Sequence, residues 1–191
     1  TGGAFHVAYE QCPMCDSADI PYQVEAKVSD HPLFDAALPP TMKWRACEGC
    51  GHFFTEGHYT PEGRQVVTSS MRPEEALGHE AGRRRKISGR IVARVARHMP
   101  TGEWLDVGTG NGSLLFTAAE WGYDTIGMDR RIDTVERLLK LGHKAFWNDV
   151  ETLDDVEGAE RFSVVSLAGG LPRAPYPKRA LAAAHRLLRR G

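Results

Sequence analysis

The sequence predicts an α/β protein in which a doubly wound, mainly parallel sheet occupies residues 83–191 and a small cysteine-bearing domain precedes it. Two observations lead to this prediction. After residue 102, short apolar runs alternate with stretches of helical periodicity, which is typical of a parallel sheet with crossover helices. All four cysteines precede residue 51, in two C-x-x-C pairs.

The elements of the sheet domain follow one another at regular intervals. The expected strands are residues 103–107, 124–128, 144–147 and 162–167, and the helices are residues 113–121, 133–141 and 178–190. Upstream, an apolar stripe at helical spacing predicts a helix from Arg83 that ends before Pro100; its members are Ile87, Ile91, Val95 and Met99. Residues 58–82, rich in glycine, proline and small polar residues, are expected to be a linker with short helical pieces.

Composition excludes few functions, but it bears on the class of partner and on the cellular compartment. The chain has 191 residues, 41% hydrophobic and 26% charged, and its net charge of -1 favours neither a nucleic-acid nor a membrane partner for the whole molecule. It has no apolar stretch of membrane-spanning length and no signal peptide at its start, so we expect a cytoplasmic protein without a membrane partner. The basic stretch 83–97 is either a solvated helix face or, less favoured because no aromatic residue interrupts it, an RNA-binding surface.

The two cysteine pairs have the spacing of a zinc ribbon, expected over residues 1–57. Each C-x-x-C turn places two thiolates on one side of a tetrahedral ion; the expected ligands of Zn²⁺ are Cys12, Cys15, Cys47 and Cys50. Two disulfides are disfavoured in a cytoplasmic chain, and a redox C-x-x-C would normally be single. Four thiolates leave no open coordination position, so the predicted metal is structural, and we interpret His52 and His58 nearby as surface residues.

The stretch WLDVGTGNG, residues 104–112, predicts a strand that runs into a glycine-rich ligand-binding turn. A phosphate-binding loop would need a lysine after the glycines, and a dinucleotide site would need G-x-G-x-x-G instead of the observed G-x-G-x-G. Asp106, two positions before the first glycine, is unfavourable for a pyrophosphate and favourable for a cation. The turn therefore predicts a cationic ligand without phosphate.

These residues resemble the first motif of the class I, Rossmann-like S-adenosylmethionine-dependent methyltransferases, which reads hydrophobic-D-x-G-x-G-x-G. The resemblance covers residues 84–191 and implies that S-adenosylmethionine is the cofactor. It implies that the glycines admit the cofactor, that Asp106 favours its amino group, that Asp129 at the end of the second strand binds the ribose hydroxyls, and that residues 148–150 lie near the adenine. The implied cofactor-binding residues are Asp106, Gly108, Gly110, Asn111, Gly112, Asp129, Arg130, Asn148, Asp149, Val150 and Ser166.

The resemblance implies methyl transfer. The order of a zinc ribbon followed by such a domain resembles that of family members that act on sugars, secondary metabolites or RNA. A small-molecule acceptor is our main hypothesis. The alternatives are an RNA methyltransferase that binds through the ribbon and the basic helix, and a non-catalytic cofactor-binding module. The loop after the fourth strand, SLAGGLPRAP, lacks the family's usual carboxylates and histidine, so no catalytic base is assigned; the remaining candidates are His58, Tyr59, His79 and His143.

The sequence given ends where relatives turn into a fifth strand. We therefore expect a sheet that is incomplete after its fourth strand and the following helix. The fourth strand would then be an open edge that a second copy, another partner or the N-terminal region covers.

Overall fold

The computed structural model describes residues 5–32, 34–69, 76–155 and 160–190. The chain divides into two compact units, residues 1–71 and 72–191. No helix in the described ranges has both the length and the apolar character needed to cross a membrane.

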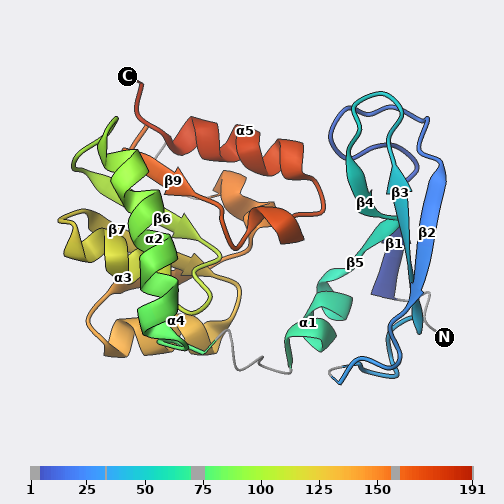
Figure 1. Ribbon diagram of the computed structural model, residues 1–191, viewed down its shortest axis with the longest axis horizontal. Helices are drawn as coiled ribbons and strands as arrows, with labels where there is room; N and C mark the ends of the chain where they lie inside the picture. The colour runs from blue at the N-terminus through green and yellow to red at the C-terminus, as the bar shows by residue number, and fades with distance from the viewer. Residues whose placement is uncertain (1–4, 33, 70–75, 156–159, 191) are drawn as a thin grey trace. The chain divides into compact units, whose positions relative to one another are not determined.

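The described part of the first unit contains two small antiparallel sheets and one helix (Figure 1). Strand β1 (His6–Ala8) pairs with β5 (Gly57–Tyr59), and β3 (Thr41–Ala46) lies between β2 (Tyr22–Lys27) and β4 (Phe53–Thr55). Helix α1 (Pro61–Ser69) follows β5. The core is small: Ile20 and Phe54 pack with Cys12 and Cys47. So little buried apolar area gives this unit only a modest hydrophobic contribution to its stability.

The second unit is the predicted α/β domain, and its sheet is parallel throughout. Helix α2 (Ala81–Ala96) precedes β6 (Glu103–Val107), α3 (Ser113–Glu120), β7 (Asp124–Asp129), α4 (Ile132–Lys140) and β8 (Lys144–Trp147). A 3₁₀ segment, η3 (Val150–Asp155), then leads to β9 (Val164–Ser166), the short η4 (Leu171–Arg173) and α5 (Pro177–Leu187). The strand order β8-β7-β6-β9 confirms the doubly wound α/β prediction, because the direction of strand addition reverses after β8.

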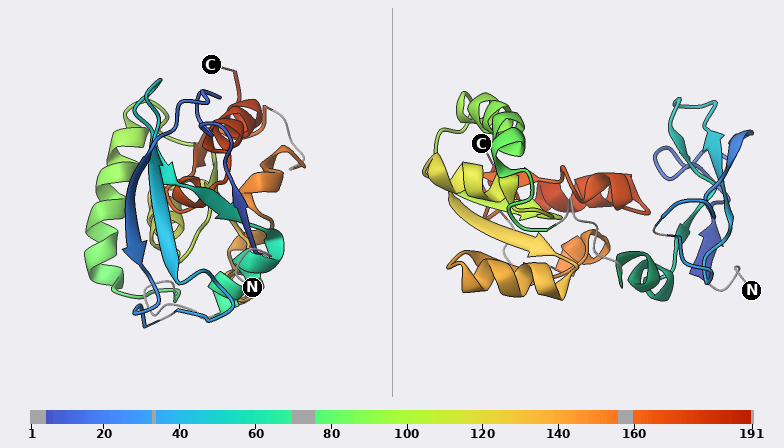
Figure 2. Two further views of the ribbon diagram at one scale, coloured as in Figure 1. Left: turned by 90° about the vertical axis from the view of Figure 1, so that its right-hand side faces the viewer. Right: turned by 60° about the horizontal axis from the view of Figure 1, so that its bottom comes forward.

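Helices cover both faces of this sheet. On one face, Leu105, Val107, Ile126 and Met128 pack against apolar residues of η3 and α5. On the other face, Trp104 packs with residues of α2 and α3, and Gly127 lies beneath Leu138 of α4. Figure 2 shows α2 and α5 on opposite sides of this unit. Strands buried on both faces read as continuous apolar runs, which is why the sequence predicted them correctly.

Two details differ from the sequence-based expectation. The buried side of α2 carries Ser88 and Val92, whereas Ile87 and Ile91 of the predicted apolar stripe are 56% and 40% exposed. The outer edge of the fourth strand is also not entirely open, because Leu188 forms an isolated parallel bridge with Phe162 just before β9. The Phe162 backbone bonds to Leu187 and Arg189 on either side of this bridge.

Candidate functional site

The glycine turn joins β6 to α3 through three residues in the left-handed region of backbone space. Gly108, Gly110 and Gly112 have φ angles of 75°, 54° and 79°, which cost little for glycine and much for other residues. The turn is held to the neighbouring strand because the Gly108 N–H donates to the Met128 carbonyl at 2.8 Å. The sequence therefore needs glycine here for the shape of the turn.

Asp129, the last residue of β7, connects directly to this turn. Its side chain is 5% exposed; Oδ2 accepts a hydrogen bond from the Gly110 N–H, and Oδ1 accepts one from the Arg131 N–H, both at 2.9 Å. Each carboxylate oxygen can accept a second hydrogen bond. Asp129 is thus fixed in orientation and retains the capacity to accept from two hydroxyls of a ligand.

Asp106 is the second carboxylate of the site, and it lies beneath the turn. It is 2% exposed, and its Oδ1 accepts a 2.6 Å hydrogen bond from the Ser166 hydroxyl. Burial raises the pKa of Asp106 to about 6; the Ser166 hydrogen bond lowers this pKa, and the charge of Asp129 raises it. The strand register explains the contact, because Asp106 of β6 pairs with Ser166 of β9.

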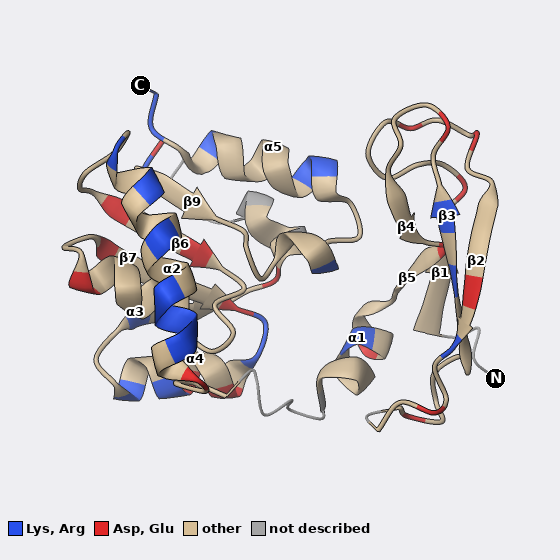
Figure 3. Cartoon of the chain, viewed as in Figure 1, with Lys and Arg blue, Asp and Glu red and all other residues tan. Residues whose placement is uncertain are grey.

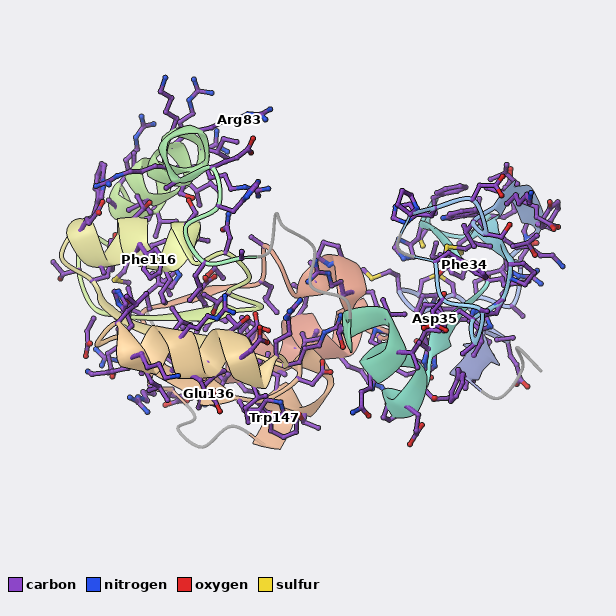
Figure 4. The ribbon with its side chains drawn as sticks, turned by 90° about the horizontal axis from the view of Figure 1, so that it is seen from below. Phe34, Asp35, Arg83, Phe116, Glu136 and Trp147 are labelled. Atoms are coloured by element: carbon purple, nitrogen blue, oxygen red, sulfur yellow. The ribbon has the colours of Figure 1, made fainter. Side chains whose placement is uncertain are left out.

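The ends of β7 and β8 complete one side of a cavity. The Asn148 N–H donates to the Asp129 carbonyl at 3.2 Å, and the Trp147 indole N–H donates to the Arg130 carbonyl at 2.8 Å. Trp147 is labelled in Figure 4. The cavity between these strand ends and the glycine turn is lined by Val107, Gly108, Met128, Asp129, Arg130, Asn148, Asp149, Val150, Gly169, Gly170 and Arg173.

Six of the eleven predicted cofactor residues line this cavity: Gly108, Asp129, Arg130, Asn148, Asp149 and Val150. The other five lie beside it. Asp106 and Ser166 lie beneath the turn, Gly110 touches the cavity residue Asp129, and Gly112 packs against Phe116. Asn111 faces the preceding segment, where its Nδ2 donates to the His79 carbonyl at 3.3 Å.

The loop after β9 forms a further wall of the cavity and approaches the glycine turn closely, and the sequence did not predict this contact. A Cβ on Gly169 would lie 2.1 Å from the Gly108 carbonyl oxygen, and a Cβ on Gly108 would lie 2.6 Å from the Gly170 nitrogen. Only glycines allow two backbone segments to approach so closely. With this loop in place the cavity has a volume of about 30 Å³. The adjacent glycines 169 and 170 were the sequence signal that could have indicated the contact.

None of the four candidates for a catalytic base lines this cavity. His58 and Tyr59 belong to β5 in the first unit. His79 and His143 border a different pocket beside α3, where the His143 ring lies 4.8 Å from that of Phe116. Phe116 is labelled in Figure 4. The basic and acidic side chains at the cavity are Arg130, Arg173, Asp129 and Asp149.

The four cysteines come together in the first unit. Their sulfur atoms all lie within 4.8 Å of one another, with Cys12 and Cys47 buried and Cys15 and Cys50 exposed. The sulfur atoms of Cys15 and Cys47 lie 3.4 Å apart, and those of Cys12 and Cys50 lie 3.8 Å apart. A tetrahedral ion about 2.3 Å from each sulfur requires sulfur separations of about 3.8 Å. The geometry therefore fits a four-thiolate metal site.

Comparisons with known proteins give a family model and solved structures to which this chain is similar. A family model described as a methyltransferase domain matches residues 79–191. No curated protein sequence matches the chain. Among solved structures, a candidate S-adenosyl-L-methionine-dependent methyltransferase of Methanococcus maripaludis is 14% identical with a TM-score of 0.47; the match covers 64% of each chain.

A second solved structure is the 1,6-didemethyltoxoflavin-N1-methyltransferase of Burkholderia thailandensis with 1,6-didemethyltoxoflavin and S-adenosylhomocysteine bound. It is 20% identical with a TM-score of 0.40, and the match covers 59% of this chain and 53% of the other. The chain thus spans between about half and two thirds of the length of these two structures.

Proposed function

Because the chain belongs to the methyltransferase domain family over residues 79–191, we propose that it is an S-adenosylmethionine-dependent methyltransferase. The observation that supports this most directly is the bond between Asp129 and the Gly110 N–H, which joins the predicted ribose-binding carboxylate to the glycine turn. S-adenosylmethionine supplies a methyl group activated by a sulfonium. The chain's own residues have to bind and orient it.

The chemistry of the cavity suits this cofactor. Asp129 has acceptor capacity left for both ribose hydroxyls. Asn148, Asp149 and Val150 form the wall beside Asp129, where we place the adenine. The acidic pair Asp106 and Asp129 creates a negative potential that favours the cofactor's two cationic groups and disfavours a pyrophosphate.

The small volume of the cavity places a condition on cofactor binding. About 30 Å³ is far below the roughly 300 Å³ or more of a typical small-molecule site. We propose that the loop of residues 167–173 moves away from Gly108 when the cofactor binds. Loop displacement of this kind is a common part of enzyme closure and opening.

We assign the acceptor to the small-molecule class, such as a sugar or secondary metabolite. The support is the order of the domains, because a zinc ribbon followed by a methyltransferase domain resembles the arrangement in enzymes that act on small molecules of this kind. The loop after β9 carries no carboxylate, so we expect an acceptor that reacts without a base from this loop. Arg173 of this loop lines the cavity and suits an anionic group on the acceptor. We further propose that the four cysteines hold a structural Zn²⁺ that stabilises the first unit.

Calorimetry with S-adenosylmethionine and S-adenosylhomocysteine tests the proposal. We expect both to bind the wild type, and Asp129→Ala to weaken binding about tenfold or more, because two charge-assisted hydrogen bonds are lost. Asp124→Ala is the matched control, since Asp124 lies at the opposite end of β7 and pairs with Lys144 at the surface. Equal affinities of the wild type and Asp129→Ala would contradict the ribose assignment.

Transfer of a labelled methyl group to pooled small molecules or RNA then separates the remaining alternatives. We expect label in the small-molecule pool. Label in RNA would support the RNA methyltransferase, and cofactor binding without label in any pool would support a non-catalytic module.

A further inference from the structure

Helix α2 presents a line of basic side chains on its outward face. Arg83, Lys86, Arg90, Arg94 and the capping residue Arg97 follow one another at spacings of three and four residues, so they share one side of the helix. All five are exposed, and they lie opposite the buried Ser88 and Val92. Figure 3 shows the basic residues along α2, and Figure 4 shows Arg83 at its N-terminal end.

Most of these charges are not neutralised. At its N-terminal end, Arg83 pairs with Glu80 at 3.6 Å. Within the described part of the chain, no acidic side chain forms an ion pair with Lys86, Arg90, Arg94 or Arg97. Several cations elsewhere on this unit are paired: Arg161 binds Glu103 at 3.0 Å, and Lys144 binds Asp124 at 2.8 Å. The outward face of α2 therefore carries concentrated positive charge.

The helix surfaces on either side of these basic residues differ, and this difference helps to identify the class of partner. One flank carries the small residues Gly82, Gly89, Ala93 and Ala96. A Cβ at Gly82 or Gly89 would meet no atom within 4 Å, so an extended partner could approach the helix closely there. The other flank carries the exposed Ile87 and Ile91. The charges thus form the centre of the face, and the apolar groups form one border.

This arrangement distinguishes the classes of partner. A second copy of the same face is excluded by like charge. A membrane-binding helix places its apolar residues at the centre of the contact and its cations at the border, which is the reverse of what α2 shows. A protein interface normally has a central apolar or aromatic anchor, which this face lacks. A polyanion with charges repeated along a line suits it best.

We propose that the outward face of α2 binds the phosphate backbone of a nucleic acid duplex. The five cations extend over fourteen residue steps, which is about 21 Å at 1.5 Å per residue. This length is comparable to the distance that several successive phosphates of one strand span. The face carries no aromatic residue for stacking on bases, so its charges are expected to contact the phosphates of a duplex rather than unstacked bases. This function is separate from the proposed methyl transfer and does not depend on it.

Fluorescence anisotropy with a labelled RNA duplex and a DNA duplex of the same sequence tests the proposal. For five phosphate contacts we expect the logarithm of the association constant to fall with the logarithm of salt concentration with a slope of about -4.5. Arg90→Gln with Arg94→Gln should make that slope less steep by about 1.8 and weaken binding at low salt. Glutamine keeps the helix propensity, and circular dichroism verifies that α2 is retained.

The matched control removes two cations from another helix. Arg137→Gln with Lys140→Gln, in the last turn of α4, makes the same change in net charge and should leave the slope unchanged. Absence of salt-dependent binding to either duplex, or equal losses in both double variants, would overturn the proposal. Binding to vesicles of anionic lipid without binding to a duplex would also overturn it and would assign the face to a membrane surface.

Discussion

The Ser166 hydroxyl on β9 donates a 2.6 Å hydrogen bond to the buried carboxylate of Asp106 on β6. The indole N–H of Trp104 donates to the same hydroxyl oxygen at 2.8 Å. Trp104 and Asp106 lie two residues apart on one strand and therefore face the same side of the sheet. The Ser166 hydroxyl thus accepts from Trp104 and donates to Asp106, so these two hydrogen bonds orient the Asp106 carboxylate.

The burial of Asp106 predicts a stability cost that depends on pH. Burial raises the pKa of Asp106 from 3.8 to about 6. Between these values the folded state binds more protons than the unfolded state, so the stabilisation from this group is present at low pH and is lost as the pH rises through about 6. We expect Asp106→Asn to raise the free energy of unfolding at pH 7 by about 1–3 kcal/mol.

Urea unfolding followed by helical circular dichroism measures this change, because four of the five described α-helices belong to the second unit. The advantage of Asp106→Asn over the wild type should shrink when the pH is lowered towards 5, where Asp106 is protonated. Asp124→Asn, at the exposed end of β7, should show no such trend. An asparagine variant that is less stable than the wild type at pH 7 would contradict the cost assigned to the buried charge.

Ser166→Ala should change the pH dependence of cofactor binding, given the proposed function. The Ser166 hydrogen bond lowers the pKa of Asp106, so its removal moves that pKa above about 6 and leaves less of the carboxylate ionised near neutral pH. We expect S-adenosylmethionine affinity to fall at pH 7 and to recover partly near pH 8. Calorimetry at both pH values measures it, and Ser166→Thr, which keeps the hydroxyl, is the control. A uniform loss at both pH values would indicate a purely structural role.

Removal of metal should affect the two units differently. The first unit has a small core around Cys12 and Cys47, so the proposed Zn²⁺ contributes much of its folding free energy. A strong chelator, or Cys47→Ser, should increase hydrogen exchange over β2, β3 and β4 and leave β6 to β9 protected. Exchange mass spectrometry together with measured zinc content tests this. An unchanged first unit after complete loss of zinc would contradict a structural metal site.

The sequence predicted the parallel sheet and the position of Asp129 at the end of its second strand for one physical reason. Both depend on a strand, a turn and a helix that follow one another directly, so spacing along the chain determines spacing in the fold. The three positive φ angles at Gly108, Gly110 and Gly112 likewise follow from local backbone sterics. Local geometry of this kind therefore follows from the sequence alone.

Contacts between distant segments could not be predicted from local spacing. The approach of Gly169 and Gly170 to Gly108 joins loops about sixty residues apart, and no periodicity reports it. In α2, the apolar stripe with Ile87 was predicted to face the core. The structure instead packs Val92 against the cluster around Trp104, and Ser88 forms a hydrogen bond with Ser113 of α3 at 3.0 Å. The side of α2 that is buried thus depends on contacts with the partner helix α3.

The loop contact leads to a last prediction, about access to the cavity. A methyl group at position 169 would lie 2.1 Å from the Gly108 carbonyl oxygen, so Gly169→Ala should move the loop of residues 167–173 away from the glycine turn. If the cofactor binds only the open arrangement, apparent affinity increases with the fraction of molecules in which the loop is open. We expect the variant to bind S-adenosylmethionine several-fold more tightly in calorimetry.

Two further variants separate opening of the loop from general disturbance. Gly89→Ala adds a methyl group to α2 where no atom lies within 4 Å, so it should leave affinity unchanged. Gly108→Ala meets the same loop from the other side, but its φ of 75° strains the turn that positions Asp129, so affinity should fall. Weaker binding by Gly169→Ala, similar to that of Gly108→Ala, would show that the loop supports the cofactor site in its closed position and would refute the gating role.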